Sequence, residues 1–186
     1  MGKIKHQGLA TGTSGSGQIT LENTIASSMN SAIKKDLEFE MQNKDRMAEI
    51  LIDAGVKKFN KEDLLFVTKD STGMLIFLEK GNDRAGLEHI INGNNAQKND
   101  NGHLEDFVKL HNIDPRDIKA HIYNIITNGK LLCSINKERG YDRVYSYKDN
   151  YFILSGIGKN GYIVTCIPIT KKRALKIKED NVNGKK

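Results

Sequence analysis

The order of apolar and polar positions divides the chain into a polar start, a helical stretch and a longer segment that mixes helices with strands. Residues 1–18 are too rich in glycine, serine and threonine to bury a core, and we expect a flexible leader there. Residues 19–63 carry apolar positions at the spacing of one helix face, which predicts a helical linker segment. These positions are Ile25, Met29, Ile33 and Leu37 in a first helix and Met47, Ile50 and Leu51 in a second helix.

Residues 64–170 carry the pattern of the main domain. Two apolar runs, 64–68 and 74–78, flank a polar turn and predict a β-hairpin. After Gly129 the runs become rich in aromatic and β-branched residues and are separated by turns. The predicted helices are 84–92, 103–111 and 114–128, and the predicted later strands are 131–135, 143–147, 151–155 and 162–167. This order predicts an α+β fold in which N-terminal helices precede a helical layer packed on an antiparallel β-meander.

Composition favours one globular domain with tails. The chain has 186 residues, of which 38% are hydrophobic. It contains no apolar run of the roughly 18 residues that a membrane span needs, and the first residues lack the order of a secretory signal. We therefore expect a soluble protein with no membrane partner. Cys133 and Cys166 lie in strand-like runs, where a buried free thiol is more common than the alternative, a disulfide.

The positive charge lies toward the end of the chain. The net charge of +6 is uneven: lysines and arginines minus acids give 0 over residues 1–63, −2 over 64–128, +3 over 129–170 and +5 over 171–186. We predict a basic tail over 171–186. A basic sheet and tail would attract a polyanion such as RNA through counterion release, although a lysine-rich terminus is equally common as a solvated tail.

Four motifs in the main domain occur in an order that resembles a known nuclease superfamily. They are Leu78-Glu79-Lys80-Gly81-Asn82, Gly86-Leu87-Glu88-His89-Ile90, His103-Leu104-Glu105-Asp106-Phe107, and Gly156-Ile157-Gly158-Lys159-Asn160-Gly161-Tyr162-Ile163-Val164-Thr165. Together they resemble the superfamily that joins barnase, EndoU, colicin tRNases and RelE (BECR), and within it the polymorphic-toxin and phage-associated members. The resemblance covers residues 64–170 and implies a BECR-type ribonuclease domain there.

The resemblance also implies a function. It implies a toxin-type endoribonuclease that needs no metal or other cofactor and cleaves RNA, possibly tRNA, through the ribose 2′-hydroxyl to leave a 2′,3′-cyclic phosphate. Such an enzyme implies a cognate immunity protein as partner. It also implies secretion or delivery as part of a larger toxin and action in the target-cell cytoplasm.

Two histidines are the candidate proton-transfer groups. Histidine suits both proton transfers because its ordinary pKa of about 6.5 allows one ring to be neutral and another charged. The resemblance makes His89 the candidate general base, and the alternative is a histidine that is hydrogen-bonded at a helix–sheet junction. His103 begins a helix and is the candidate second group. We interpret the other histidines as solvated or structural; they are His6, His111 and His121.

Ser155 and Thr165 match positions where relatives place hydroxyls against the scissile phosphate. If residues 157–160 close a regular hairpin, Ser155 pairs with Tyr162, and Ser155 and Thr165 lie on opposite faces. They share a face only if the glycine-rich turn contains a bulge or an odd loop. The alternative for Thr165 is an ordinary strand residue.

Five further residues are candidates for substrate binding. Lys80, Lys137 and Arg139 could donate charge-assisted hydrogen bonds to a phosphate, although surface loops commonly carry such charges. Tyr147 and Tyr151 could stack on a base or bind the phosphate. No spacing of cysteine, histidine and acid is typical of a metal site, and no Walker or Rossmann glycine motif is present.

A second function remains open from the sequence. In relatives the second histidine follows the first helix closely, whereas here the polar, asparagine-rich residues 92–102 intervene. A member of this fold that has lost a catalytic group would be a non-catalytic module that binds RNA or protein.

Overall fold

The computed structural model describes residues 42–93, 102–138 and 140–183. The chain divides into two compact units, residues 1–43 and 44–186, and the description below concerns the second unit. Its elements are a helix that ends at residue 53, η1 (Lys61–Asp63), β1 (Leu64–Lys69), β2 (Leu75–Glu79), α2 (Leu87–Asn92), α3 (Leu104–His111), η2 (Pro115–Asp117), α4 (Ile118–Asn128), β3 (Lys130–Lys137), β4 (Gly140–Tyr147), β5 (Asn150–Gly158), β6 (Thr165–Ile169) and α5 (Lys171–Asn183). Helices and antiparallel sheets are both present, which confirms the predicted α+β fold.

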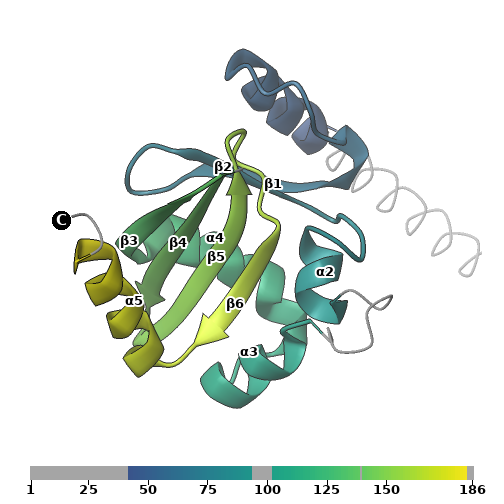
Figure 1. Ribbon diagram of the computed structural model, residues 1–186. Coiled ribbons are helices and arrows are strands. Elements are labelled where there is room, and N and C mark those ends of the chain that lie inside the picture. Colours follow the sequence, from purple (N-terminus) through teal and green to yellow (C-terminus); the bar gives the residue numbers. More distant parts are fainter. Residues whose placement is uncertain (1–41, 94–101, 139, 184–186) are drawn as a thin grey trace, which may run out of the picture. The chain divides into compact units, whose positions relative to one another are not determined.

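Strands β3 to β6 form a four-stranded antiparallel sheet in chain order, a meander like the one predicted (Figure 1). Strands β1 and β2 form a separate antiparallel pair. The segment before β6 connects the two sheets, because Phe77 N donates to Gly161 O at 3.0 Å and Ile163 N donates to Phe77 O at 3.1 Å. The predicted strand 162–167 therefore begins as this link to β2, and pairing with β5 starts only at Thr165.

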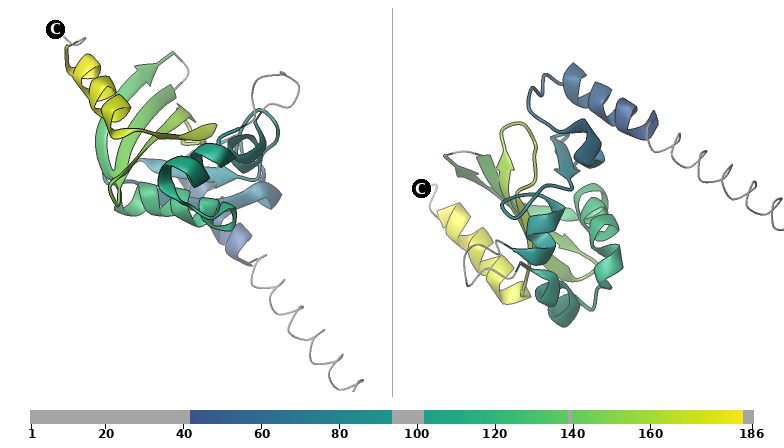
Figure 2. Two further views of the ribbon diagram at one scale, coloured as in Figure 1. Left: turned by 90° about the horizontal axis from the view of Figure 1, so that it is seen from below. Right: turned by 90° about the vertical axis from the view of Figure 1, so that its right-hand side faces the viewer.

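The four-stranded sheet buries apolar side chains on both faces, and helices α4 and α5 lie on opposite faces (Figure 2). The α4-side face packs Tyr145, Phe152 and Leu154 against the isoleucines of α4. The α5-side face packs Ile153 and its neighbours against Ala174 of α5. Because side chains alternate along a strand, each strand supplies residues to both faces.

The compact unit extends beyond the predicted domain of residues 64–170 at both ends. Met47 and Leu51 are buried against Leu64 and Phe77, so the end of the predicted linker 19–63 belongs to the fold. Residues 171–183, most of the predicted basic tail 171–186, form the helix α5, which buries Ala174 on the sheet. The charges of this segment lie mainly on the exposed side of α5.

One predicted helix is shorter than expected, and another has the predicted bounds but begins with a 3₁₀ turn. The predicted helix 84–92 begins only at Leu87, because Asn82 and Ala85 form a bridge in the preceding turn. The predicted helix 114–128 begins as η2 and continues as α4. Its start has the predicted chemistry, since the Asp114 side chain accepts from Arg116 N and a proline occupies the first position.

Candidate active site

A β-bulge in β5 brings Ser155 to the centre of a polar cluster. Tyr141 pairs with Ile157 and Arg143 pairs with Leu154, so Ser155 and Gly156 together oppose the single residue Asp142. Gly156 has a φ of 67°, which is characteristic of a bulge that needs glycine. A side chain there would also meet Val164, because a Cβ would lie 2.9 Å from the Val164 Cβ. The glycine therefore makes the bulge possible.

Asp142 connects three groups on the α5-side face. Its Oδ1 accepts from Ser155 Oγ at 2.7 Å and from Gly156 N at 3.1 Å. Its Oδ2 lies 3.3 Å from Nζ of Lys137. The Lys137 side chain is 55% exposed and the Asp142 side chain 17% exposed, so the lysine is accessible while the carboxylate is largely enclosed. The bulge, the acid and the lysine form a polar site at the end of the sheet.

Thr165 joins the same face as Ser155. The two residues are direct partners in the β5–β6 ladder, and directly opposed residues in antiparallel strands point to the same side. The regular hairpin that pairs Ser155 with Tyr162 is wrong, because Ser155 pairs with Thr165. An odd number of residues separates the two, which is the geometry under which their hydroxyls share a face. Thr165 is 9% exposed, and its Oγ1 is buried without a hydrogen-bond partner among the described residues.

His89 lies on α2, which begins beside the start of β6. Gly86 N, at the N-terminus of α2, donates to Val164 O at 3.0 Å, one residue before Thr165. The Nδ1 of His89 lies 2.9 Å from Asp83 O. A carbonyl oxygen can only accept, so Nδ1 carries the proton, and in the neutral ring Nε2 retains the lone pair. The ring is therefore held in the tautomer that a general base requires at Nε2.

His103 lies next to α2 despite the long insertion. Its backbone N donates to Ile90 O at 2.8 Å, and its Nδ1 lies 3.4 Å from Asp106 Oδ2. The ends of the insertion also meet, because a Cβ on Gly102 would lie 2.5 Å from Gly93 N. Gly93 and Gly102, the described residues on either side of residues 94–101, are therefore adjacent in space. The backbone of His103 therefore lies beside Ile90, the residue that follows His89, although the two histidines are far apart in the sequence.

The two candidate tyrosines do not join this cluster. Tyr147 lies on the α4-side face, where its ring centroid is 5.5 Å from that of His121, so it points away from the face that carries Ser155, and its role in substrate binding stays a prediction. Tyr151 lies on the α5-side face but pairs with Ile169 at the other end of β5 and packs in the core under α5. Tyr147 points to the other face because side chains alternate along a strand. Tyr151 lies far from Ser155 because the two residues are at different places along β5.

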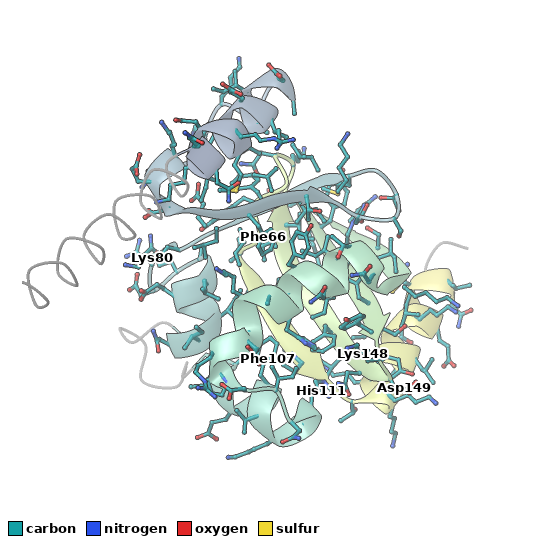
Figure 3. All side chains as sticks on the ribbon, turned by 180° about the vertical axis from the view of Figure 1, so that it is seen from behind. Phe66, Lys80, Phe107, His111, Lys148 and Asp149 are labelled. Atoms are coloured by element: carbon teal, nitrogen blue, oxygen red, sulfur yellow. The ribbon has the colours of Figure 1, made fainter. Side chains whose placement is uncertain are left out.

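The remaining basic candidates have different positions. Lys80 Nζ lies 3.9 Å from Glu88 Oε1 of α2, in the region of His89. Figure 3 shows Lys80 on the opposite side of the domain from Lys148 and Asp149. Lys137 is the only one of the three lysine and arginine candidates that contacts the Asp142 cluster among the described residues. Arg139 lies outside the described residues.

Asp142 is a candidate functional residue that the sequence interpretation omits. Aspartate is depleted in strand interiors, and here it lies between Tyr141 and Arg143 in an otherwise typical strand pattern. That anomaly is the sequence signal that could have identified it. Its partners could not have been identified in the same way, because they depend on the bulge.

The histidines interpreted as structural lie in a packed setting on the α4 side. The rings of His111 and His121 lie 4.9 Å and 5.4 Å from the ring of Phe152, between centroids. Burial, with the charges of His111 and Lys148 as smaller causes, lowers the pKa of His121. The neutral form of His121 is therefore favoured, as expected for a packed ring.

Comparisons with known proteins leave the family resemblance as an expectation. A comparison with protein-family models finds no match, and neither does a comparison with curated protein sequences. Within the described part of the chain, no helix is long and apolar enough to span a membrane, and no group of three or more histidines, cysteines and acids is placed to hold a metal ion.

Proposed function

We propose that this chain is a toxin-type, metal-independent endoribonuclease whose active site lies at the end of the sheet where β5 and β6 meet α2. The observation that carries the proposal is the Lys137–Asp142–Ser155 cluster, with Thr165 directly opposite Ser155. The exposed Lys137 ammonium can donate to a phosphate, and the Ser155 and Thr165 hydroxyls lie on the same face of the sheet. The link from Gly86 to Val164 brings the helix of His89 to the same edge.

The residues have distinct roles in the proposed reaction. His89 Nε2 removes the proton from the ribose 2′-hydroxyl, whose oxygen attacks the adjacent phosphorus. The bond from phosphorus to the 5′-oxygen breaks, and His103 donates a proton to that leaving oxygen, so the products are a 2′,3′-cyclic phosphate and a free 5′-hydroxyl. Lys137 and Ser155 stabilise the charged phosphorane, and Asp142 positions both of them. Because the nucleophile is the 2′-hydroxyl, DNA is not a substrate.

The proposal includes an inhibitory partner protein and a way for the enzyme to enter the target cell. A producing cell requires an immunity protein, and an acidic inhibitor would suit a protein with a net charge of +6. Delivery as part of a larger secreted or contact-delivered toxin would place the enzyme in the target-cell cytoplasm.

The test is incubation of the purified protein with total bacterial RNA in buffer that contains EDTA, followed by analysis of fragment ends. We expect discrete fragments with cyclic phosphate ends from the wild type and at least a hundredfold slower cleavage by His89→Ala, in line with the usual contribution of a general base, about 10²–10⁴-fold. Ser155→Ala should also slow cleavage. Ser146→Ala is the matched control, because Ser146 lies on the same face opposite Tyr151, away from the cluster. Intact RNA with the wild type would overturn the proposal.

A second candidate function is a non-catalytic RNA- or protein-binding module. It is favoured by one observation: among the described residues, no hydrogen bond joins His89 or His103 to the Asp142 cluster. Expression in bacteria separates the two functions. A ribonuclease is toxic in the wild-type form and tolerated as His89→Ala, whereas a binding module does not depend so strongly on one imidazole.

A further inference from the structure

A basic hollow lies beside the proposed active site. It has a volume of about 710 Å³ and is lined by residues 54–58, the start of β2 and the β5–β6 loop. Three lysines line it, Lys57, Lys58 and Lys159, and no acidic residue does. All three are exposed, and none forms an ion pair with any of the described residues. The hollow is thus a concave surface of uniform positive charge.

The segments that carry these lysines are fixed relative to one another. Asn160 Nδ2 donates to Lys58 O at 3.4 Å, which ties the β5–β6 loop to the segment after the first helix. Gly161 has a φ of 90°, and a Cβ there would lie 2.2 Å from Leu75 O, so only glycine allows the loop to approach β2 this closely. Phe77 N then donates to Gly161 O at 3.0 Å. The hollow is therefore formed before any ligand binds.

Strand β5 connects the hollow to the Asp142 cluster. Gly158 lines the hollow and lies three residues after Ser155, a separation of at most about 10 Å along a strand. Gly158 pairs with Gly140, and Gly140 pairs with Lys137 across the next turn. A chain of phosphates that contacts Lys137 can therefore reach the hollow at the same end of the sheet.

The lining of the hollow can contact the sugars and bases of a nucleotide chain as well as its phosphates. Val56, Met74 and Leu75 contribute apolar groups between the lysines. A ribose or base can pack on such groups while the adjacent phosphate contacts an ammonium, which combines the two interactions that single-stranded nucleic acids use on proteins. The three lysines then add counterion release to the affinity.

We propose that this hollow is an RNA-binding subsite that holds the phosphate backbone next to the nucleotide cleaved at the Asp142 cluster. The inference rests on the proposed ribonuclease function and adds to it the requirement that the substrate extend beyond the scissile bond. A substrate that ends at the cleaved dinucleotide is too short to occupy the hollow.

Binding is measured first, because it does not depend on cleavage. A fluorescent single-stranded oligonucleotide with 2′-deoxy sugars at every position is titrated with the wild type and with the triple variant Lys57→Ala, Lys58→Ala, Lys159→Ala at several salt concentrations. Three lost phosphate contacts should reduce the slope of log affinity against log salt by about 2, at about 0.7 per contact for a single strand. At low salt the affinity should fall about tenfold or more.

A second triple variant controls for net charge. Lys119→Ala, Lys172→Ala and Lys176→Ala remove the same charge from exposed positions on α4 and α5. The control should bind the oligonucleotide nearly as tightly as the wild type. Equal losses in the two variants would overturn the subsite, because they would show an effect of net charge alone. A polyglutamate peptide that binds the hollow while the oligonucleotide does not would also overturn it and would indicate an acidic protein as ligand.

Cleavage kinetics separate the subsite from the proposed function. With an RNA dinucleotide the hollow triple variant should match the wild type, whereas with a longer RNA its KM should rise about tenfold at unchanged kcat. If the wild type cleaves neither substrate, the ribonuclease proposal fails, and the binding experiment still decides the subsite. If the wild type cleaves both substrates and the triple variant cleaves both equally well, only the subsite fails.

Discussion

At the scale of single residues, Thr165 offers a test that separates catalysis from stability. Its Oγ1 is buried without a partner among the described residues, and a desolvated hydroxyl of this kind costs about 1–3 kcal/mol. Valine has nearly the same shape and no hydroxyl. Thr165→Val should therefore leave the free energy of unfolding in urea unchanged or raise it by about 1 kcal/mol.

The same substitution should lower cleavage if the hydroxyl donates to the phosphate. We expect kcat on an RNA oligonucleotide to fall about tenfold or more, with the fold intact. A variant that is as stable and as active as the wild type would assign Thr165 to the strand alone.

His121 predicts a dependence of stability on pH. Burial holds its pKa below the ordinary value of 6.5, with His111 and Lys148 acting in the same direction and Asp117 opposing them. The unfolded chain therefore binds a proton at His121 more readily than the folded chain does. Its contribution to stability is present above about pH 6.5 and is lost as the pH falls through the folded pKa.

The measurement is the urea midpoint between pH 8 and pH 5. The midpoint should decrease toward pH 5 in the wild type, and the decrease should be smaller in His121→Gln. His89→Gln is the comparison, because His89 lies on α2, away from the packed histidines. An identical decrease in the wild type and His121→Gln would contradict the assignment.

At the scale of elements, the β1–β2 turn is held on the sheet by a buried ion pair. The Asp70 side chain is fully buried, pairs with Arg143, and accepts from Tyr145 Oη at 2.9 Å. The same carboxylate accepts from Thr72 N at 2.9 Å and Met74 N at 3.1 Å. The Asp70 carboxylate therefore both stabilises the conformation of the turn and attaches the turn to β4.

Removal of this carboxylate should be strongly destabilising. Asp70→Ala leaves the Arg143 charge buried without its partner, a change that costs about 3–5 kcal/mol. Chemical denaturation should show a free energy of unfolding that is lower by this amount. The exposed Asp53→Ala should change the free energy of unfolding by less than about 0.5 kcal/mol. Equal stability of the two variants would mean that the turn is held mainly by its apolar contacts.

The insertion between α2 and α3 should be dispensable for folding. Because Gly93 and Gly102 are adjacent, two glycines in place of residues 94–101 can join them without moving either helix. Loop length has only a weak effect on stability, about 0.6 kcal/mol for each doubling. We expect a melting temperature within a few degrees of the wild type by circular dichroism. A fall of more than about 10 °C would show that the insertion stabilises the fold.

At the scale of the whole molecule, the compact unit depends on the helix that precedes β1. Leu51 is fully buried against Leu64 and Phe77, whereas its neighbour Ile52 is 62% exposed. Leu51→Ala should lower the free energy of unfolding by about 2–5 kcal/mol and Ile52→Ala by less than about 0.5 kcal/mol, both measured in urea. Similar small effects would show that the domain begins near residue 64, as the sequence pattern predicts.

The sequence determined the elements because they depend on local pattern. The aromatic and β-branched runs after Gly129 predict a meander, and the observed sheet has that order. The apolar positions of α4 and the proline after Asp114 likewise follow from helix periodicity and capping, which act over a few residues. The helix at 171–183 could not be predicted from an apolar stripe, because Ala174 is its one buried residue, Ile177 is only partly buried, and most of the other side chains are charged.

The tertiary structure decided which side chains meet. Whether Ser155 and Thr165 share a face depends on the register of β5 and β6, and one residue of slip would separate them. The role of Asp142 depends on a bulge, and the proximity of His103 to α2 depends on where an insertion rejoins the fold. Local pattern determines which elements form, but a site consists of contacts between distant segments, and those are set only when the elements pack.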